Sequence, residues 1–388
     1  MSTPKRVGIL TGGGDVPGLN TAIKGFVWRM EEAGYEVVGL RRGWAALLHV
    51  VPSGDADNAA WLLPLTRANT RTIDRSGGTV LHTSRINPAL VRADAVPPHL
   101  AGRGTPLGDG KVDLTKAALE TLESLHLEAL VAIGGDGTLS FARRLHLEGA
   151  RVLGIPKTMD NDVFGTDYCI GFSTAVTRSV NLIHDLRTVA GSHERFLVVE
   201  LFGRYSGETC LLASYLAGTD RALIAEVPFA PGTVVELLAE DKRSNPSNYA
   251  VVAVSEGTYP IGGRPFETGQ ADAVGNRELG GVGRYVRELL QEGTGERVIY
   301  QRLGYLMRSG PPDSLDRLVA SNFANLAADL ILAGEAGRMV VVDGGRYDTV
   351  PLETVGEGVK QVDVELFYDR DAYRPKITGV LGLPMFLH

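Results

Sequence analysis

The chain has 388 residues, and 39 Lys and Arg against 46 Asp and Glu give it a formal net charge of −7. With 44% hydrophobic and 22% charged residues, the composition is that of a globular enzyme and excludes disorder along the whole chain, while the mild acidity argues against nucleic-acid binding by bulk charge. No apolar run approaches the roughly 18 residues that a membrane span needs, and the first residues lack a signal-peptide pattern. Two cysteines, Cys169 and Cys210, cannot build a disulfide framework. We therefore expect a cytoplasmic protein that binds neither nucleic acid nor membranes.

Short apolar runs alternate with amphipathic segments along most of the chain. Nearly continuous apolar strands with helices between them predict an α/β fold with mainly parallel sheets covered by helices. Two Pro- and Gly-rich stretches interrupt this pattern, residues 86–112 as a surface excursion and residues 258–282 as a mobile loop beside the ligand site. Strands are expected near residues 6–11, 36–40, 129–133, 152–155, 196–201, 223–227, 249–254, 298–303 and 339–342. Helices are expected near residues 19–33, 114–127, 139–147, 174–189, 208–216, 234–242, 283–290 and 314–332.

Glycines cluster directly after several of these strands, where parallel sheets bind their ligands. The first cluster, GGGDVPGLN over residues 12–20, is not a Walker A loop, because Leu19 and Asn20 follow where Lys and Ser or Thr are needed. It is not a dinucleotide fingerprint either, because Pro17 replaces the last glycine. What remains is a set of backbone N–H groups at a helix N-terminus that suits a polyphosphate. An ordinary turn capped by Asp15 is the alternative.

Two further clusters carry carboxylates. In GGDGT, Asp136 follows a strand and could hold Mg²⁺ against a phosphate chain, with Thr138 as a cap, or the segment is a capped turn without a ligand. In GIPKTMDND, Asp160 and Asp162 stand two residues apart near Lys157. Such like charges repel, so a purely structural Asx-rich turn is the less favoured interpretation. An aspartate that accepts an alcohol proton beside cations is what phosphoryl transfer requires.

Eight segments occur in an order that resembles the phosphofructokinase family from about residue 5 to residue 334. The resemblance implies two Rossmann-like lobes with the active site in the cleft between them. It also implies phosphoryl transfer to the 1-hydroxyl of fructose 6-phosphate, which gives fructose 1,6-bisphosphate in glycolysis. The donor lobe would comprise residues 1–171 and about 303–345, and the sugar-phosphate lobe residues 172–302 and about 346–388, including a C-terminal extension that packs on this lobe or at an interface. The segments are TGGGDVPGLNTAI, GGTVLHTSR, AIGGDGT, GIPKTMDND, GTDYCIGFSTA, SHERFLVVE, FGRYSG and SEG.

Position by position, the resemblance assigns roles to individual residues. Asp160 would be the general base, Asp136 would bind Mg²⁺, and Thr158, Lys157 and Arg204 would complete the catalytic group. The donor phosphates would contact Gly13, Gly14, Arg85, Asp136, Gly137 and Thr138. The sugar phosphate would contact Asp162, Arg195, Phe202, Gly203, Glu256, Arg302, Tyr305 and Arg308.

The resemblance also bears on assembly and control. Arg195 would reach the sugar phosphate from a neighbouring subunit, so we expect a dimer or tetramer. Arg297 competes with Arg302 for one phosphate contact, and we favour Arg302. Lys24 is basic but Trp28 replaces a cation of the family's effector site, so allosteric control is not expected.

The resemblance implies that the phosphoryl donor is ATP or pyrophosphate. Gly137 leaves room for the α-phosphate of ATP, whereas Lys157 and Tyr305 are features of pyrophosphate-type relatives. We favour ATP, because space is a steric requirement and an extra cation suits either donor. The same chemistry on another sugar phosphate, such as sedoheptulose 7-phosphate, remains an alternative. A non-catalytic sugar-phosphate sensor is disfavoured, because a sensor has no use for the base Asp160.

Overall fold

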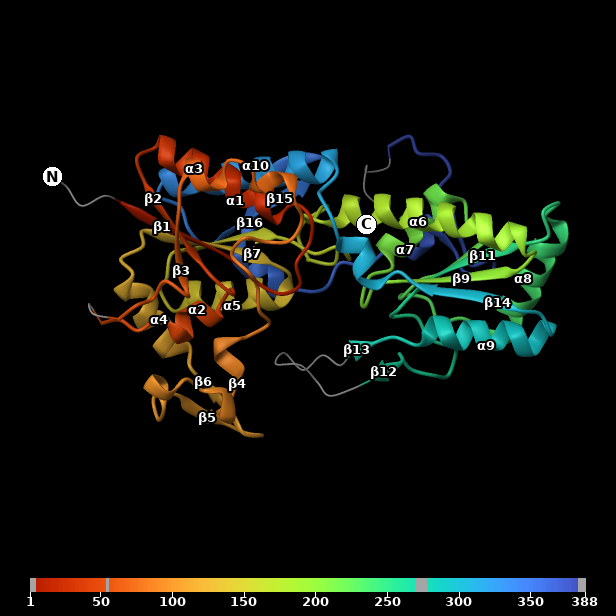
Figure 1. Ribbon diagram of the computed structural model, residues 1–388, viewed down its shortest axis with the longest axis horizontal. Helices are drawn as coiled ribbons and strands as arrows, with labels where there is room; N and C mark the ends of the chain where they lie inside the picture. Colours follow the sequence, from red (N-terminus) through yellow and green to blue (C-terminus); the bar gives the residue numbers. More distant parts are fainter. Residues whose placement is uncertain (1–4, 54–55, 269–277, 383–388) are drawn as a thin grey trace.

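Two separate sheets organise the computed structural model, which describes residues 5–53, 56–268 and 278–382. They form two α/β bodies that lie side by side (Figure 1). The larger sheet has the order β16-β15-β8-β7-β1-β2-β3; its five central strands are parallel and both edge strands are antiparallel. Its strands are β1 (Arg6–Thr11), β2 (Glu36–Leu40), β3 (Leu62–Leu65), β7 (Ala129–Gly134), β8 (Val152–Pro156), β15 (Arg338–Asp343) and β16 (Arg346–Pro351).

The second sheet has the order β10-β11-β9-β14 and is parallel throughout. Its strands are β9 (Phe196–Leu201), β10 (Arg221–Leu223), β11 (Ala250–Ser255) and β14 (Val298–Arg302). Small antiparallel sheets are formed by β4 (Val91–Arg92), β6 (Lys111–Asp113) and β5 (Thr105–Leu107), by β12 (Glu267–Thr268) and β13 (Glu278–Leu279), and by β17 (Tyr368–Asp369) and β18 (Arg374–Pro375).

Helices cover both faces of each sheet, as the apolar strands require. Along β1, Val7 and Ile9 face one core and Leu10 faces the other. The first core continues from α1 and α10 through α6 to the second sheet, so one apolar layer joins the two bodies. The helices are α1 (Leu19–Glu32), α2 (Ala45–His49), α3 (Arg67–Thr70), α4 (Thr115–Ser124), α5 (Asp136–Leu147), α6 (Phe172–Ser192), α7 (Glu208–Ala217), α8 (Pro231–Ser244), α9 (Val282–Thr294), α10 (Ser314–Leu332) and α11 (Val364–Phe367).

The predicted fold class is confirmed, and one predicted strand is wrong. The strand expected over residues 223–227 ends at Leu223, because the chain turns there and Val227 N–H donates to the Ile224 carbonyl.

Residues 86–112 carry the small β4-β6-β5 sheet, which projects from the first body (Figure 1). Residues 269–277 of the predicted loop over 258–282 lie outside the described residues. Among the described residues, no helix is long and apolar enough to span a membrane.

The C-terminal extension contacts both bodies rather than the second alone. Strand β16 pairs with β15 in the larger sheet, although we expected residues 346–388 in the second lobe. Beyond it, Phe367, Tyr368 and Tyr373 pack into the outer core of the second sheet, and Tyr373 accepts a hydrogen bond from Ala222 N–H at 2.8 Å. The lobe boundaries themselves stay a prediction.

A buried carboxylate ties α10 to the start of α6. Asp316 accepts hydrogen bonds from the Tyr168 hydroxyl at 2.7 Å, from Gly171 N–H at 2.7 Å and from Thr174 N–H at 2.8 Å. Its removal leaves these buried donors without an acceptor, at roughly 1–3 kcal/mol each. We predict that Asp316→Ala lowers the free energy of unfolding in urea by about 3 kcal/mol. The control Asp329→Ala, which removes an exposed ion pair with Arg29, should cost under about 1 kcal/mol. Equal losses would contradict the assignment.

Candidate active site

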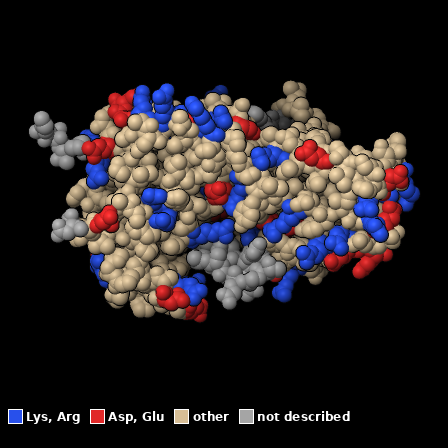
Figure 2. Space-filling view, in the orientation of Figure 1, with Lys and Arg blue, Asp and Glu red and all other residues tan. Residues whose placement is uncertain are grey.

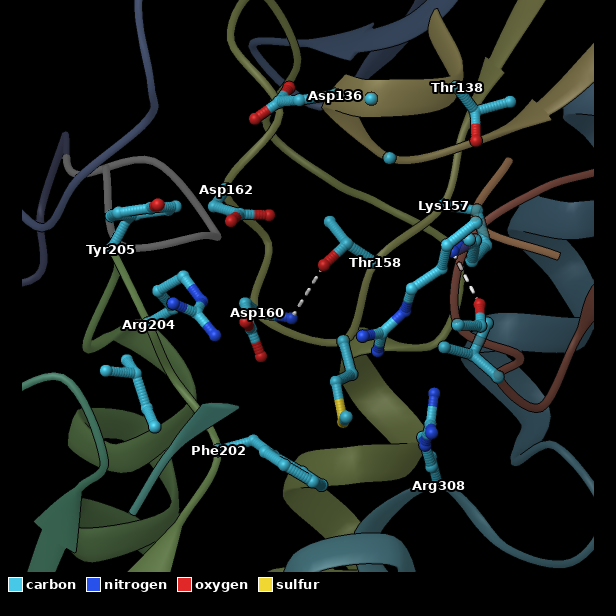
Figure 3. A pocket seen from close by; sticks show the side chains of 18 of the residues that line it. Asp136, Thr138, Lys157, Thr158, Asp160, Asp162, Phe202, Arg204, Tyr205 and Arg308 are labelled. Carbon is cyan, nitrogen blue, oxygen red and sulfur yellow. Dashed lines mark hydrogen bonds between the residues drawn. The ribbon is translucent and has the colours of Figure 1, made fainter. Parts of the chain in front are cut away.

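A cavity of about 1050 Å³ opens between the two bodies, at the carboxyl ends of their parallel strands. Figure 2 shows basic and acidic side chains gathered where the surface is hollowed there. The predicted site residues line this cavity, with the exceptions of Arg195 and Gly203. In Figure 3 the carboxylates of Asp136, Asp162 and Asp160 follow one another down one side, with Lys157 and Arg308 across from them.

Glycines let the loops after β1 and β7 approach each other closely. Gly12 N–H donates to the Ile133 carbonyl at 2.9 Å, and a Cβ on Gly12 would lie 2.5 Å from Thr138 Oγ1. A Cβ on Gly14 would lie 2.3 Å from Arg308 Nη1. Any side chain at these positions would therefore displace Thr138 or Arg308 from the cavity wall.

Asp136 begins α5 and has the features of a cation ligand. Its Oδ1 is buried and accepts no hydrogen bond within the described ranges. Desolvation, together with the charge of Asp162, raises its pKa to about 7. Those ranges contain no group of three His, Cys, Asp or Glu side chains that could enclose a metal. A cation at Asp136 would therefore need phosphate and water oxygens, and this ligand set is the one that Mg²⁺ prefers.

The turn after β8 carries the two predicted catalytic carboxylates. Thr158 Oγ1 accepts a hydrogen bond from Asp160 N–H at 3.2 Å, and Asn161 has a left-handed backbone with φ 56° (Figure 3). Desolvation, Asp162 and Glu256 raise the pKa of Asp160 well above its usual range, against the influence of Arg204. Asp160 Oδ1 has no hydrogen-bond partner among the described residues. An unpartnered carboxylate oxygen with a raised pKa is suited to accept a proton from a bound hydroxyl.

Cations surround the phosphate side of the cavity. Lys157 is 4% exposed, and its Nζ donates to the Gly14 carbonyl at 2.6 Å. Burial and then Arg308 lower the pKa of Lys157 to about 8. Arg308 donates to the Asp15 carbonyl at 3.1 Å from the short 3₁₀ helix η5 (Gly304–Arg308). The glycine-rich loop is therefore flanked by a lysine and an arginine that can bind phosphate oxygens.

The opposite part of the cavity combines acids, an arginine and aromatic side chains. Arg302 Nη2 lies 3.2 Å from Glu256 Oε2, and its Nε lies 3.4 Å from Oε1 of the buried Glu200. Burial raises the pKa of Glu256 to about 7, although Arg302 acts in the opposite direction. Phe202 and Tyr305 pack edge to face at 6.0 Å beside Arg302. Arg302 lines the cavity and Arg297 is not among its lining residues, whereas the contact of either with a sugar phosphate stays a prediction.

Two predicted residues lie apart from the cavity lining. Arg195 directly precedes β9, at the amino end of the strand, whereas the cavity lies beyond its carboxyl end. Gly203 shapes the turn after β9, since its φ is 138° and a Cβ there would lie 2.5 Å from Ser255 Oγ. Within one chain, therefore, Arg195 does not join the other residues.

Sequence reasoning missed several lining residues near Arg85 and Thr138. Those around Arg85 could have been found from their neighbour, because they share its loop. Trp44 gave no such signal, since it reaches the site only through packing and donates from Nε1 to the Thr138 carbonyl at 3.3 Å. The missed residues are Trp44, Ser84, Ile86, Asn87 and Ser140.

Comparisons with known proteins agree on one family. The family model for phosphofructokinase matches residues 6–331. A pyrophosphate–fructose 6-phosphate 1-phosphotransferase from Amycolatopsis methanolica is 36% identical over 370 residues, which are 95% of this chain and 99% of the relative. An ATP-dependent 6-phosphofructokinase from Chloroflexus aurantiacus is 35% identical over 355 residues, 90% and 91% of the two chains. The structure of a pyrophosphate-dependent phosphofructokinase from Nitrosospira multiformis superposes with a TM-score of 0.76 at 16% identity. The match covers 99% of this chain and 96% of that chain, and it supports the fold.

The lowered pKa of Lys157 predicts how stability changes with pH. Between the pKa of about 8 in the folded protein and the ordinary lysine pKa of 10.5, the unfolded chain binds more protons, so the stability of the wild type rises with pH in this window. Lys157→Met lacks this contribution. In urea, the wild type should gain up to about 3 kcal/mol relative to the variant from pH 8 to 10.5. Lys376→Met, which removes an exposed lysine, is the matched control. A constant difference for Lys157→Met would contradict the prediction.

Proposed function

The chain belongs to the phosphofructokinase family, and from this premise we propose that it transfers a phosphoryl group from ATP to the 1-hydroxyl of fructose 6-phosphate. The product is fructose 1,6-bisphosphate. The observation that carries the proposal is the unpartnered Oδ1 of Asp160, which stands in the wall of a cavity lined on one side by phosphate-binding loops. We further propose a cytoplasmic enzyme, consistent with the free cysteines Cys169 and Cys210.

In this mechanism Asp160 takes the proton of the 1-hydroxyl. Burial, together with Asp162 and Glu256, raises the pKa of Asp160, which makes its carboxylate a stronger base. Lys157, Arg85 and Arg204 stabilise the negative charge on the transferred group. Asp136 would hold Mg²⁺, which supplies charge neutralisation for the donor phosphates.

The sugar phosphate occupies the part of the cavity that extends from Glu256 and Arg302 to Arg308. Arg308 and Arg302 bind its 6-phosphate and Glu256 accepts hydrogen bonds from its hydroxyls. Arg195 completes this part from a second subunit, so the proposed enzyme is a dimer or tetramer. We propose fructose 6-phosphate as the acceptor, and a longer sugar phosphate such as sedoheptulose 7-phosphate is the alternative acceptor.

Both donors have specific support. ATP is favoured because Gly137 adds no side chain at the start of α5, and because Trp44 and Ile86 line the cavity together with the phosphate-binding residues, where an apolar surface suits a nucleotide. Pyrophosphate is favoured by Lys157 and Tyr305 and by the names of relatives such as the Amycolatopsis enzyme. We prefer ATP over pyrophosphate, because a nucleotide requires space that Gly137 leaves free, whereas a cation such as Lys157 can bind either donor.

Replacement of the proposed base tests the chemistry. Asp160→Asn keeps the shape of the side chain but removes the proton acceptor, so kcat should fall by about 10²-fold or more. Calorimetric affinity for fructose 6-phosphate should stay within a few-fold of wild type. The control Asp185→Asn changes an exposed carboxylate on α6 and should leave both quantities unchanged. Activity of Asp160→Asn within tenfold of wild type would remove Asp160 from this role.

A side-by-side assay tests the donor. With Mg²⁺ and fructose 6-phosphate, the wild type should show a kcat/KM for ATP at least about tenfold above that for pyrophosphate, and Gly137→Asp should reduce ATP use selectively because its side chain crowds the nucleotide. A preference of the wild type for pyrophosphate would overturn the donor assignment and leave the acceptor chemistry intact.

A further inference from the structure

The turn that carries Asp160 is held from behind by contacts outside the cavity lining. Thr209 Oγ1 donates to the Met159 carbonyl at 2.7 Å. Asn161 Nδ2 donates to Glu208 Oε2 at 3.0 Å and to the Asp167 carbonyl at 2.9 Å. Asn161 adopts a left-handed backbone, which asparagine tolerates better than most residues, and these contacts fix its side chain and the neighbouring Met159 carbonyl.

Lys360 from the C-terminal extension joins the same group. Its side chain is 8% exposed, and its Nζ lies 3.1 Å from Glu208 Oε2 and 2.9 Å from the Asp167 carbonyl. Its backbone N–H donates to the Asp162 carbonyl at 3.0 Å, and the neighbouring Val359 forms a β-bridge with Val163. Lys360 thus contacts both the turn and the residue that supports the turn.

The charge of Lys360 has a defined partner. Glu208 is fully buried, and its Oε1 accepts no hydrogen bond from the described residues. Burial raises the pKa of Glu208 to about 7, while Lys360 and Asn161 favour the charged form. A buried carboxylate that loses its cation either takes up a proton or moves toward water. Either change would weaken the acceptor that holds the Asn161 side chain.

We propose that Lys360 is a positioning residue for phosphoryl transfer, which fixes the turn of Asp160 through Glu208 and the Asp162 carbonyl; this inference rests on the proposed function. Lys360 lies beyond residue 331, where the match to the family model ends, and it does not line the cavity. Its effect therefore passes through the turn. A displacement of a catalytic group by about 1 Å can cost about 10²-fold in rate.

Lys360→Met tests the inference. We expect kcat to fall about 10- to 100-fold with KM for fructose 6-phosphate and donor within about threefold, because the binding residues Glu256, Arg308 and Gly13 lie outside the turn. Lys376→Met, an exposed lysine on the same extension, should match wild type. The double variant Lys360→Met/Glu208→Gln removes both charges and keeps an acceptor for Asn161, so it should recover part of kcat.

The outcomes separate the two hypotheses. A wild type without activity on fructose 6-phosphate refutes the proposed function. An active wild type with Lys360→Met within twofold in kcat, or with kcat and KM changed in parallel, overturns the inference. If Lys360→Met does not fold, the double variant decides: a folded double variant with a selective loss of kcat supports positioning, and one with wild-type kcat overturns it.

Discussion

The carboxylates of Asp160 and Asp162, set two residues apart in the wall of one cavity, impose the constraint on which the rest of the structure depends. Burial raises the pKa of both groups, the charge of Asp162 adds to the rise at Asp160, and both groups require cations nearby. The fold brings these cations from three segments: Lys157 before the turn, Arg204 after β9, and Lys360 from the C-terminal extension. Because the two buried carboxylates need these cations nearby, the cavity combines a proton acceptor with groups that bind phosphate.

The arrangement of the sheets brings these carboxylates and cations together. Parallel strands end at one edge, so the loops after β1, β7 and β8 converge without long excursions. The first core runs from α1 and α10 through α6 to the second sheet and joins the two bodies behind the cavity. Phosphate-binding loops from one body therefore face the sugar-binding side chains of the other across a common space.

Local patterns predicted most of the fold and of the site. Apolar runs located the buried parallel strands, and glycines followed by Asp136 or Asp160 marked the loops at their ends. The misplaced strand over residues 223–227 depends on distant partners, because Glu226 accepts hydrogen bonds from Gly207 and Val362 N–H groups. The edge strand β16 was missed although it pairs with β15, the strand directly before it in the sequence. Lys360 contacts the Asp167 carbonyl across 193 positions of sequence, a separation at which no local pattern carries information.

A crystal structure of the protein with fructose 6-phosphate alone tests the central claim most directly. The account predicts that the sugar binds in the cavity with its 1-hydroxyl oxygen within about 3.2 Å of the Asp160 carboxylate, and with its 6-phosphate against Arg308. A sugar bound outside the cavity, or one whose 1-hydroxyl faces away from Asp160 while the 6-phosphate lies elsewhere, would contradict the account.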